Sequence, residues 1–465
     1  MTAEEPSGAV SFEDLQISCE GVVPPVVATA AADGTPNITY LSCAHLLDGE
    51  RIALSNQFFS KTARNIAENP YAQVLLIDPR NYDEYRLDLV YERTDRHGPA
   101  FDALRRQVDA VAALVGMQDV FRLRAADVYR ILAAELVPNR PARRAVGDRG
   151  HITTPGTVSG GPAEVAELSA RLGRSPDLDT LVETALRGLA ELLGFRNSIL
   201  LLVDETGARL YTIASHGYAA EGVGSEIVVG DGTAGVAADQ CRAVRVANVG
   251  QSRRYAHAVR ASYEAAGDVG PGREIALPGL AEVESQLAVP LMAMGRFVGV
   301  LMVESALQLA FDETDEATLT VVAGMVANAI EIDRVRERDL ADAGLPAGST
   351  ARPAPVVPTT QVRFFAVDGS VFFGADYLIK GVAGRILWSL LNAHVQEGRE
   401  EFTNREVRLD PTLELPEYRD NLESRLILLK RRLDEREAPV RIEKTGRGRF
   451  RLAVATPLQL EVAGA

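Results

Sequence analysis

The sequence is poor in the features that mark membrane, secreted and metal-binding proteins. No apolar run reaches the roughly 18 residues that a membrane-spanning helix needs. The acidic N-terminus lacks the basic and apolar segments of a signal peptide. Only three cysteines occur among 465 residues, and Cys19, Cys43 and Cys241 are far apart. This spacing forms no metal-binding pattern and fits a reducing cytosol, so we expect a cytoplasmic protein without a membrane anchor.

Motifs of common enzyme classes are also missing. The chain shows no Walker loop, kinase motif, phosphoacceptor domain or catalytic triad. The glycine-rich stretch Gly230–Gly235 is not followed by Lys-Ser/Thr and does not sit in a βαβ unit, so it is no phosphate-binding loop. Its glycines instead allow a tight turn from strand to helix. These absences favour binding and regulation over a dedicated metabolic activity.

Two stretches rich in proline, glycine and serine divide the chain. We expect linkers at residues 138–162 and 341–361, because neither shows apolar periodicity and their prolines cannot continue a helix. They separate an α+β protein into three domains, at residues 11–137, 163–340 and 362–465.

The charge is uneven along the chain. The net charge is −15, yet residues from 361 onward hold 17 Lys+Arg against 16 Asp+Glu. An acidic body with a locally basic end is expected where only that end meets nucleic acid. A helix with a solvated charged face explains the same pattern without a nucleic acid.

Short strand-like runs dominate residues 11–137. VVATAAA, NITYLSCAHLL, RIALSN, AQVLLID and YRLDLVYERT read as strands, with a turn at Asp33-Gly34. A helix is expected from Ser60 and is stopped by Pro70. Several antiparallel strands around one helix indicate a small barrel.

This order resembles the pyridoxamine 5′-phosphate oxidase-like split barrel. The resemblance rests on residues 33–36 (DGTP), 54–56 (LSN) and 60–65 (SKTARN), with Asn69-Pro70 after them. It implies a homodimer that binds FMN; related barrels bind haem or a deazaflavin. The residues that would then bind the cofactor are Ser55, Asn56, Ser60, Lys61, Thr62 and Arg64.

The residue types in this stretch suit a phosphate group. A helix N-terminus offers unpaired N–H groups to an anion, Ser60 and Thr62 add hydroxyl donors, and Lys61 and Arg64 add positive charge. Alternatively, Ser60 only caps the helix and the two cations are solvated. Asn37 stands where the oxidases have a basic residue, which argues against oxidase activity.

Residues 163–340 contain amphipathic helices and apolar strands. Leu178–Leu193 carries a helical apolar stripe, with Gly188 lying off it, and SILLLVD, RLYTIASHG and SQLAVPLMAMGRFVGVLMVES read as strands. FDETDEATLTVVAGMVANAIEI closes the segment as a helix with acidic residues in its first turn.

The whole segment resembles a GAF domain. The matching motifs are GDGTAG from Gly230, SQLAVPL from Ser285, GVL from Gly299 with Glu304, and then Phe311 and Asp315. The resemblance implies a six-stranded antiparallel sheet with helices on one face and a ligand pocket on the other. The helix at residues 312–338 could also pair with its copy in a homodimer.

The stretch at residues 248–282 should cover that pocket, because long loops inside compact domains are usually functional. Its candidate ligand-binding residues, which suit an anionic or aromatic small molecule, are Arg253, Arg254, Tyr255, His257, Arg260 and Tyr263. The alternative is a solvated surface helix.

The C-terminal segment reads as a hairpin, three helices and a second hairpin. This order, with LKRRL at residues 429–433 and TGRGRF at residues 445–450, resembles the winged-helix effector domains of response regulators. In the last helix, Leu422, Leu426, Leu429 and Leu433 form a core stripe, and Asn421, Arg425, Leu428 and Arg432 form a second stripe that we expect to face outward.

DNA binding is the expected role of that second stripe. Asn421, Arg425 and Arg432 would reach base edges, and Arg447 and Arg449 of the second hairpin would meet phosphates. A protein-interaction platform is the alternative, because six acidic residues are interspersed between Arg419 and Arg451.

These features together predict a sensory transcription regulator. The GAF and barrel domains would sense a small ligand or a redox state, and the winged helix would bind DNA. A flavin-dependent oxidoreductase with regulatory domains, or a signalling adaptor whose winged helix binds protein, are the alternatives.

Overall fold

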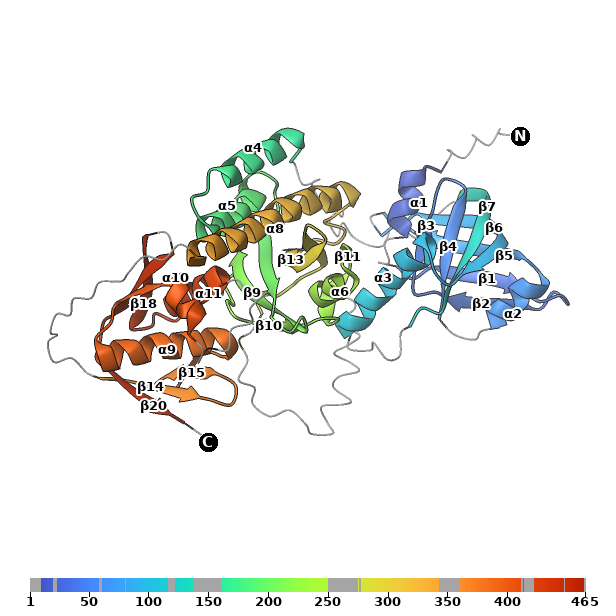
Figure 1. Ribbon diagram of the computed structural model, residues 1–465. Coiled ribbons are helices and arrows are strands. Elements are labelled where there is room, and N and C mark those ends of the chain that lie inside the picture. The colour runs from blue at the N-terminus through green and yellow to red at the C-terminus, as the bar shows by residue number, and fades with distance from the viewer. Residues whose placement is uncertain are drawn as a thin grey trace, which may run out of the picture.

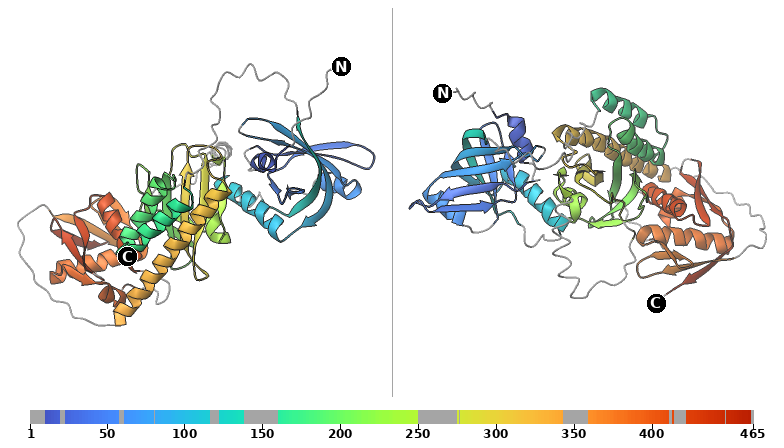
Figure 2. Two further views of the ribbon diagram at one scale, coloured as in Figure 1. Left: turned by 90° about the horizontal axis from the view of Figure 1, so that it is seen from above. Right: turned by 180° about the vertical axis from the view of Figure 1, so that it is seen from behind.

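The computed structural model describes residues 10–19, 23–57, 61–79, 81–115, 122–137, 160–249, 275, 277–342, 359–410, 413, 422–446 and 448–463. These residues form a barrel module (10–137), a central module (160–342) and a C-terminal module (359–463). The barrel and C-terminal modules lie at opposite ends, with the central module between them (Figures 1 and 2).

The barrel module is built on a curled antiparallel sheet of seven strands in the order β2-β1-β5-β6-β7-β4-β3. The strands are β1 (Val26–Ala30), β2 (Pro36–Tyr40), β3 (Ala44–Leu46), β4 (Arg51–Asn56), β5 (Tyr71–Ile77), β6 (Glu84–Asp95) and β7 (Ala125–Val137). Along β5, buried Ala72, Val74 and Leu76 alternate with more exposed residues, so one face of the sheet forms the core. The half-barrel agrees with the predicted split barrel.

Local turn chemistry in the barrel follows the sequence. Gly34 has a φ of +84°, and the Thr35 backbone N–H donates to the Asp33 carboxylate at 2.9 Å, which closes the predicted turn between β1 and β2. The helix α2 spans Lys61–Glu68, before Pro70.

Two further helices of this module were not predicted. α1 (Phe12–Ser18) is capped by Ser11. α3 (Pro99–Val115) buries Leu104 and Val108 against the barrel, and its Ala110 and Ala113 pack into the core of the central module. Figure 1 shows α3 reaching from the barrel to the central module. The helix therefore joins two modules.

The central module has the predicted six-stranded antiparallel sheet. The strand order is β10-β9-β8-β13-β12-β11. The strands are β8 (Asn197–Val203), β9 (Arg209–His216), β10 (Glu226–Val228), β11 (Val244–Val246), β12 (Ser285–Ala293) and β13 (Arg296–Ser305). The helices α4 (Pro162–Gly173), α5 (Leu178–Glu191) and α8 (Glu313–Asp342) cover one face, and α6 (Gly232–Gln240) lies on the other (Figure 1).

The two faces of this sheet have separate cores. On β8, Leu200 and Leu202 pack toward α5 and α8, and Ile199 and Leu201 pack toward α6. The glycine-rich stretch makes the predicted turn into α6, with φ values of +91° at Gly230 and +60° at Gly232.

Gly188 lies at a close contact between two helices. It is buried, and a Cβ atom there would lie 2.4 Å from Leu168 Cδ1 of α4. The glycine therefore allows α4 and α5 to approach each other.

The C-terminal module has the predicted hairpin, three helices and second hairpin, together with three strands that were not predicted, at residues 376–379, 401–403 and 458–462. The module contains a four-stranded sheet of order β16-β15-β14-β20, three helices and a three-stranded sheet of order β17-β19-β18. The elements are β14 (Thr360–Phe365), β15 (Ser370–Phe373), β16 (Asp376–Ile379), α9 (Gly381–Glu397), β17 (Glu401–Thr403), α10 (Asn404–Leu409), α11 (Leu422–Glu435), β18 (Val440–Gly446), β19 (Arg449–Val454) and β20 (Leu458–Val462). Thr403 caps α10, because its Oγ1 accepts from the Glu406 N–H at 3.2 Å.

None of the helices in the described ranges is both long and apolar enough to cross a membrane. The described residues also contain no group of three or more His, Cys, Asp or Glu side chains placed to hold a metal ion.

Candidate functional site

Two cationic side chains at the start of α2 are candidates to bind a phosphate group. Lys61 and Arg64 are exposed, and among the described residues neither has a hydrogen-bond or ion-pair partner. The Thr62 Oγ1 accepts from Asn37 Nδ2 at 2.9 Å, so its own hydroxyl proton can still be donated. Ser60 lies outside the described residues. The start of α2 thus carries two positive charges that an anion could contact.

The side chains of Ser55 and Asn56 instead form hydrogen bonds within the barrel. The Cys43 N–H donates to Ser55 Oγ at 3.2 Å, and Asn56 Nδ2 donates to Asp127 Oδ2 at 3.0 Å. Thr94 Oγ1 donates to the other Asp127 oxygen at 2.6 Å. Burial raises the pKa of Asp127 against the effect of these two donors. A flavin phosphate therefore fits Lys61 and Arg64 better than it fits the end of β4.

A chain of buried polar side chains crosses the α6 face of the central sheet. Thr233 Oγ1 donates to Gln286 Oε1 at 2.6 Å, and Gln286 Nε2 donates to Glu304 Oε1 at 2.7 Å. The Leu280 backbone N–H donates to Glu304 Oε2 at 3.1 Å. Tyr218 is partly buried beside this carboxyl group, and burial followed by the charge of Glu304 raises the pKa of its hydroxyl.

Strand register explains why this cluster forms. Gln286 of β12 lies directly opposite Glu304 of β13, so both side chains leave the same face of the sheet. Polar groups in an apolar core cost free energy unless they are hydrogen-bonded, and this cluster offers carboxyl and amide oxygens to a ligand that donates hydrogen bonds. The predicted ligand-binding residues all lie outside the described residues: Arg253, Arg254, Tyr255, His257, Arg260 and Tyr263.

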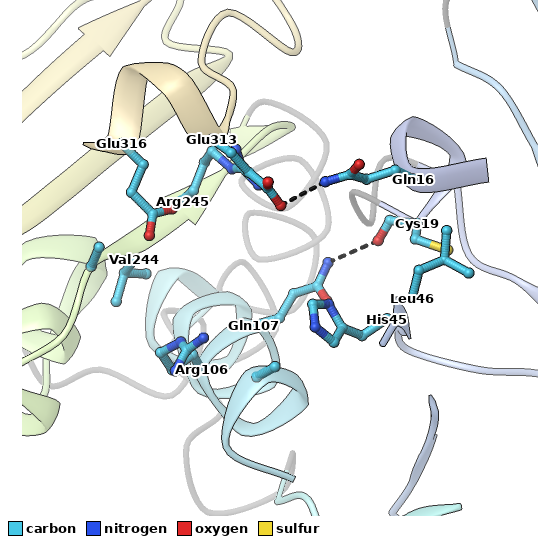
Figure 3. A pocket seen from close by; sticks show the side chains of 12 residues that line it. Gln16, Cys19, His45, Leu46, Arg106, Gln107, Val244, Arg245, Glu313 and Glu316 are labelled. Atoms are coloured by element: carbon cyan, nitrogen blue, oxygen red, sulfur yellow. Dashed lines mark hydrogen bonds between the residues drawn. The ribbon is translucent and has the colours of Figure 1, made fainter. Parts of the chain in front are cut away.

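A cavity of about 130 Å³ lies between the barrel and central modules (Figure 3). Its polar lining comes from α1, β3 and α3 on one side and from β11 and α8 on the other: Gln16, His45, Arg106, Gln107, Arg245, Glu313 and Glu316. Gln16 Nε2 donates to Glu313 Oε1 at 2.6 Å across the cavity. Burial, and then the charge of Arg106, lower the pKa of His45. The sequence did not predict this cavity, because α3 was not predicted.

The predicted outward stripe of α11 is buried. The exposed fractions of Arg425, Leu428 and Arg432 are 7%, 3% and 6%, so the prediction of a solvent-facing stripe is wrong for this structure. The reason is that α11 is covered on both sides, by its own module and by the central module. The predicted core stripe of leucines is confirmed, since all four are at most 6% exposed: Leu422, Leu426, Leu429 and Leu433.

The other predicted DNA contacts are placed differently. Arg432 is held inside its own module, where Nε donates to the Leu378 carbonyl oxygen at 2.9 Å and Nη1 donates to Glu435 at 2.6 Å. Arg449 is exposed at the start of β19. Asn421 and Arg447 lie outside the described residues.

Arg425 contacts the central module. Its Nη2 lies 2.6 Å from Glu205 Oε2, in the turn between β8 and β9. Its guanidinium carbon lies 4.2 Å from the centre of the Tyr211 ring of β9. A partly buried ion pair and a cation–π contact therefore hold the same side chain.

Further basic side chains meet carboxylates near the start of α5. Lys430 Nζ lies 2.7 Å and Arg431 Nη2 lies 2.8 Å from the two oxygens of Asp179. Burial acts to raise the pKa of Asp179, but the hydrogen bonds from these two cations outweigh it, and the net shift is downward. Lys444 of β18 lies 3.3 Å from Asp177. We call Asp177, Asp179 and Glu205 the acidic face.

The acidic face was not predicted from sequence. Asp177 caps α5, Asp179 lies in its first turn and Glu205 lies in a turn, which are ordinary positions for acidic residues. Only the packing of the C-terminal module against them distinguishes them from solvated acids.

Two family models match parts of the chain. A model described as pyridoxamine 5′-phosphate oxidase matches residues 24–132. A GAF domain model matches residues 175–331. Neither range reaches the C-terminal module. No curated protein matches the chain.

Solved structures resemble the two matched modules one at a time. An FMN-binding protein from Syntrophomonas wolfei subsp. wolfei is 16% identical over 28% of this chain and 87% of its own, with a TM-score of 0.24. The GAF domain of a phosphoenolpyruvate-protein phosphotransferase from Acinetobacter is 21% identical over 37% and 93%, with a TM-score of 0.31.

A third structure is the free methionine-R-sulfoxide reductase from Neisseria meningitidis in complex with its substrate. It is 23% identical over 37% of this chain and 89% of its own, with a TM-score of 0.29. At these levels the likeness concerns the fold alone. The family models and the observed sheets together show that the chain contains a pyridoxamine 5′-phosphate oxidase-like split barrel and a GAF domain.

Proposed function

We propose that the chain is a regulator in which the GAF domain binds a small molecule and controls a C-terminal winged-helix domain that binds DNA. The observation that carries the proposal is the direct contact between the acidic face of the GAF domain and α11. A sensor domain that touches its effector helix can change the availability of that helix when its own structure responds to a ligand.

The ligand side of the proposal rests on the polar cluster under α6. Thr233, Gln286 and Glu304 are at most 7% exposed and are linked by hydrogen bonds. Ligand pockets combine an apolar lining with a few placed polar groups, and this face of the sheet has both. The oxygens of Gln286 and Glu304 favour a ligand that carries N–H or O–H donors.

The proposal that the C-terminal module binds DNA rests on its element order and its charge. Three helices followed by a hairpin that pairs with β17 is the arrangement of a winged helix, and α11 would be its recognition helix. The module is close to electrically neutral, with 17 Lys+Arg and 16 Asp+Glu from residue 361 onward, within a chain of net charge −15. Arg449 is exposed on the hairpin, and we expect it to contact a phosphate.

The full chain is expected to bind duplex DNA at low salt and to lose affinity as salt rises, because phosphate contacts release counterions. Arg449→Ala should weaken binding to every sequence and lower the slope of log K against log[salt] by about one unit. Fluorescence anisotropy with labelled genomic fragments at several salt concentrations measures both. Arg86→Ala, a barrel surface residue paired with Glu135, is the control. No binding at low salt would remove DNA from the proposal.

We also infer a homodimer through α8. Its Val321, Ile332 and Val335 are 49%, 52% and 49% exposed. With Met325 and Asn328 they follow alternating steps of four and three residues, which is the spacing of a coiled-coil seam. An apolar groove of about 470 Å³ between α4 and α8 adjoins Val321 and Met325. Light scattering should give twice the chain mass, and a monomer at micromolar concentration would contradict the seam.

One observation favours the adaptor as a second candidate. The stripe of α11 that should read bases includes Leu428, which is 3% exposed and packed in an apolar core together with the neighbouring Ile427. Apolar side chains suit contact with protein better than contact with phosphates. If DNA binding is absent, a protein partner for this face becomes the leading proposal.

A further inference from the structure

The GAF domain contacts α11 along the length of the helix. Near the start of α11, Arg425 meets Glu205 at 2.6 Å, and in the middle Lys430 and Arg431 meet Asp179. At the end of the helix, Glu435 Oε1 accepts from the Gly222 backbone N–H at 3.1 Å. Figure 1 shows α11 beside β9.

We propose that the acidic face is a docking surface that sequesters α11, so that the GAF domain holds the C-terminal module in an inactive state until the contact opens. This inference deepens the proposed function, because it names how the helix is regulated. The docked state is the one seen in this structure.

The chemistry of the contact explains why docking and DNA binding exclude each other. Asp179 accepts hydrogen bonds from Lys430 Nζ and from Arg431 Nε and Nη2. Carboxylates and phosphates are recognised by the same charge-assisted hydrogen bonds from lysine and arginine. Each cation of α11 that is paired with the acidic face is therefore withheld from a phosphate.

Apolar packing strengthens the docked state. Tyr211 of β9 and Leu428 of α11 belong to one continuous buried cluster that spans both modules. Arg425 lies over the Tyr211 ring, and its side chain is only 8% exposed. Release therefore requires the separation of buried surfaces as well as ion pairs, which suits a two-state contact and not a loosely tethered domain.

The docking surface is connected to the ligand face of the same domain. Gly222 and Glu226, which contact Glu435 and Lys380 of the C-terminal module, flank the start of β10. β10 leads through the glycine turn into α6, whose Thr233 belongs to the polar cluster. A ligand that moves α6 therefore acts on the segment that meets the C-terminal module.

The test removes two carboxylates of the acidic face in the full chain. Asp179→Asn with Glu205→Gln leaves shape almost unchanged and deletes the charges that hold Arg425, Lys430 and Arg431. The control is Glu183→Gln with Glu191→Gln, which removes the same charge from exposed pairs on α5 with Arg187 and Arg171. Hydrogen exchange of residues 422–435 reports docking, and anisotropy with duplex DNA reports binding.

We call Asp179→Asn with Glu205→Gln the docking variant, and we expect the backbone amides of α11 to exchange faster in it than in the wild type or the control variant. We also expect the docking variant to bind DNA roughly tenfold more tightly than the control variant does, which is within the range of ordinary coupling between sites. Unchanged exchange in the docking variant would overturn the proposal. Faster exchange with DNA affinity equal to that of the control would overturn the competition with DNA. If neither protein binds DNA but α11 exchanges faster only in the docking variant, the docking surface stands and DNA is rejected as the partner.

Discussion

Gly384→Val is expected to unfold the C-terminal module. Gly384 lies in the first turns of α9, and a Cβ atom there would be 1.9 Å from the carbonyl oxygen of Gly369. Because that oxygen is backbone in the turn between β14 and β15, it cannot rotate away as a side chain can. The two added methyl groups worsen the clash, and we expect a loss of roughly 3 kcal/mol or more.

Trp388 reports this loss directly. It is the only tryptophan of the chain, and its ring stacks on Phe364 at 4.9 Å between ring centres. Urea unfolding followed by its fluorescence should move to a lower midpoint in the variant. Gly446→Ala is the control in the same module, because its Cβ would meet nothing within 4 Å, and we expect it to stay within about 0.5 kcal/mol of the wild type. An unchanged Trp388 transition in Gly384→Val would contradict the packing of α9 on this turn.

Lys61→Ala together with Arg64→Ala is expected to lower the affinity for FMN at least roughly a hundredfold, because each charge-assisted hydrogen bond to a phosphate contributes about 1.5–3 kcal/mol. Both side chains are exposed and have no partner among the described residues, so their loss should leave the barrel intact. Quenching of flavin fluorescence during titration measures the affinity.

Riboflavin separates phosphate recognition from binding of the ring, since it lacks the phosphate. The double variant should bind riboflavin as the wild type does. Arg86→Ala with Arg93→Ala removes two cations from β6 that are paired with Glu135 and Asp95, and it should leave FMN binding unchanged. A wild type that takes up no FMN, or a double variant that binds it equally well, would contradict the phosphate site.

Local sequence signals predicted much of the fold because they depend on few residues. The turn at Asp33-Gly34 is set by the backbone conformation of Gly34 and by one hydrogen bond, and the turn at Gly230 is set by the positive φ of its glycines. Apolar runs of strand length indicated four strands of the central sheet, and the six-stranded antiparallel sheet itself was expected from the resemblance to a GAF domain.

Contacts between modules could not be predicted in the same way. The arginines of α11 occupy helix positions that suit solvent or DNA equally well, and only the presence of Glu205 and Tyr211 across the interface shows that Arg425 is covered. Likewise, Ala110 and Ala113 of α3 are small residues with a weak apolar signal, yet they are buried against the central module. Tertiary packing decides both cases.

Two residues of the polar cluster under α6 are polar positions in strands that are mostly apolar. Gln286 is the second residue of β12 and Glu304 is the next-to-last residue of β13, and each is buried. Such a residue reads as a solvent-facing position until its cross-strand partner is known. Only the antiparallel register of β12 and β13, which pairs Gln286 with Glu304, shows that the two side chains meet. This register cannot be read from the sequence of either strand alone.

Hydrogen exchange of the full chain with and without duplex DNA tests the central claim most directly, because that claim is that α11 contacts either the GAF domain or DNA. On addition of DNA, we expect faster exchange at residues 177–180 and 204–211, where the GAF domain loses its contacts with α11. DNA binding with unchanged exchange at these residues, or no DNA binding at any salt concentration, would contradict the claim.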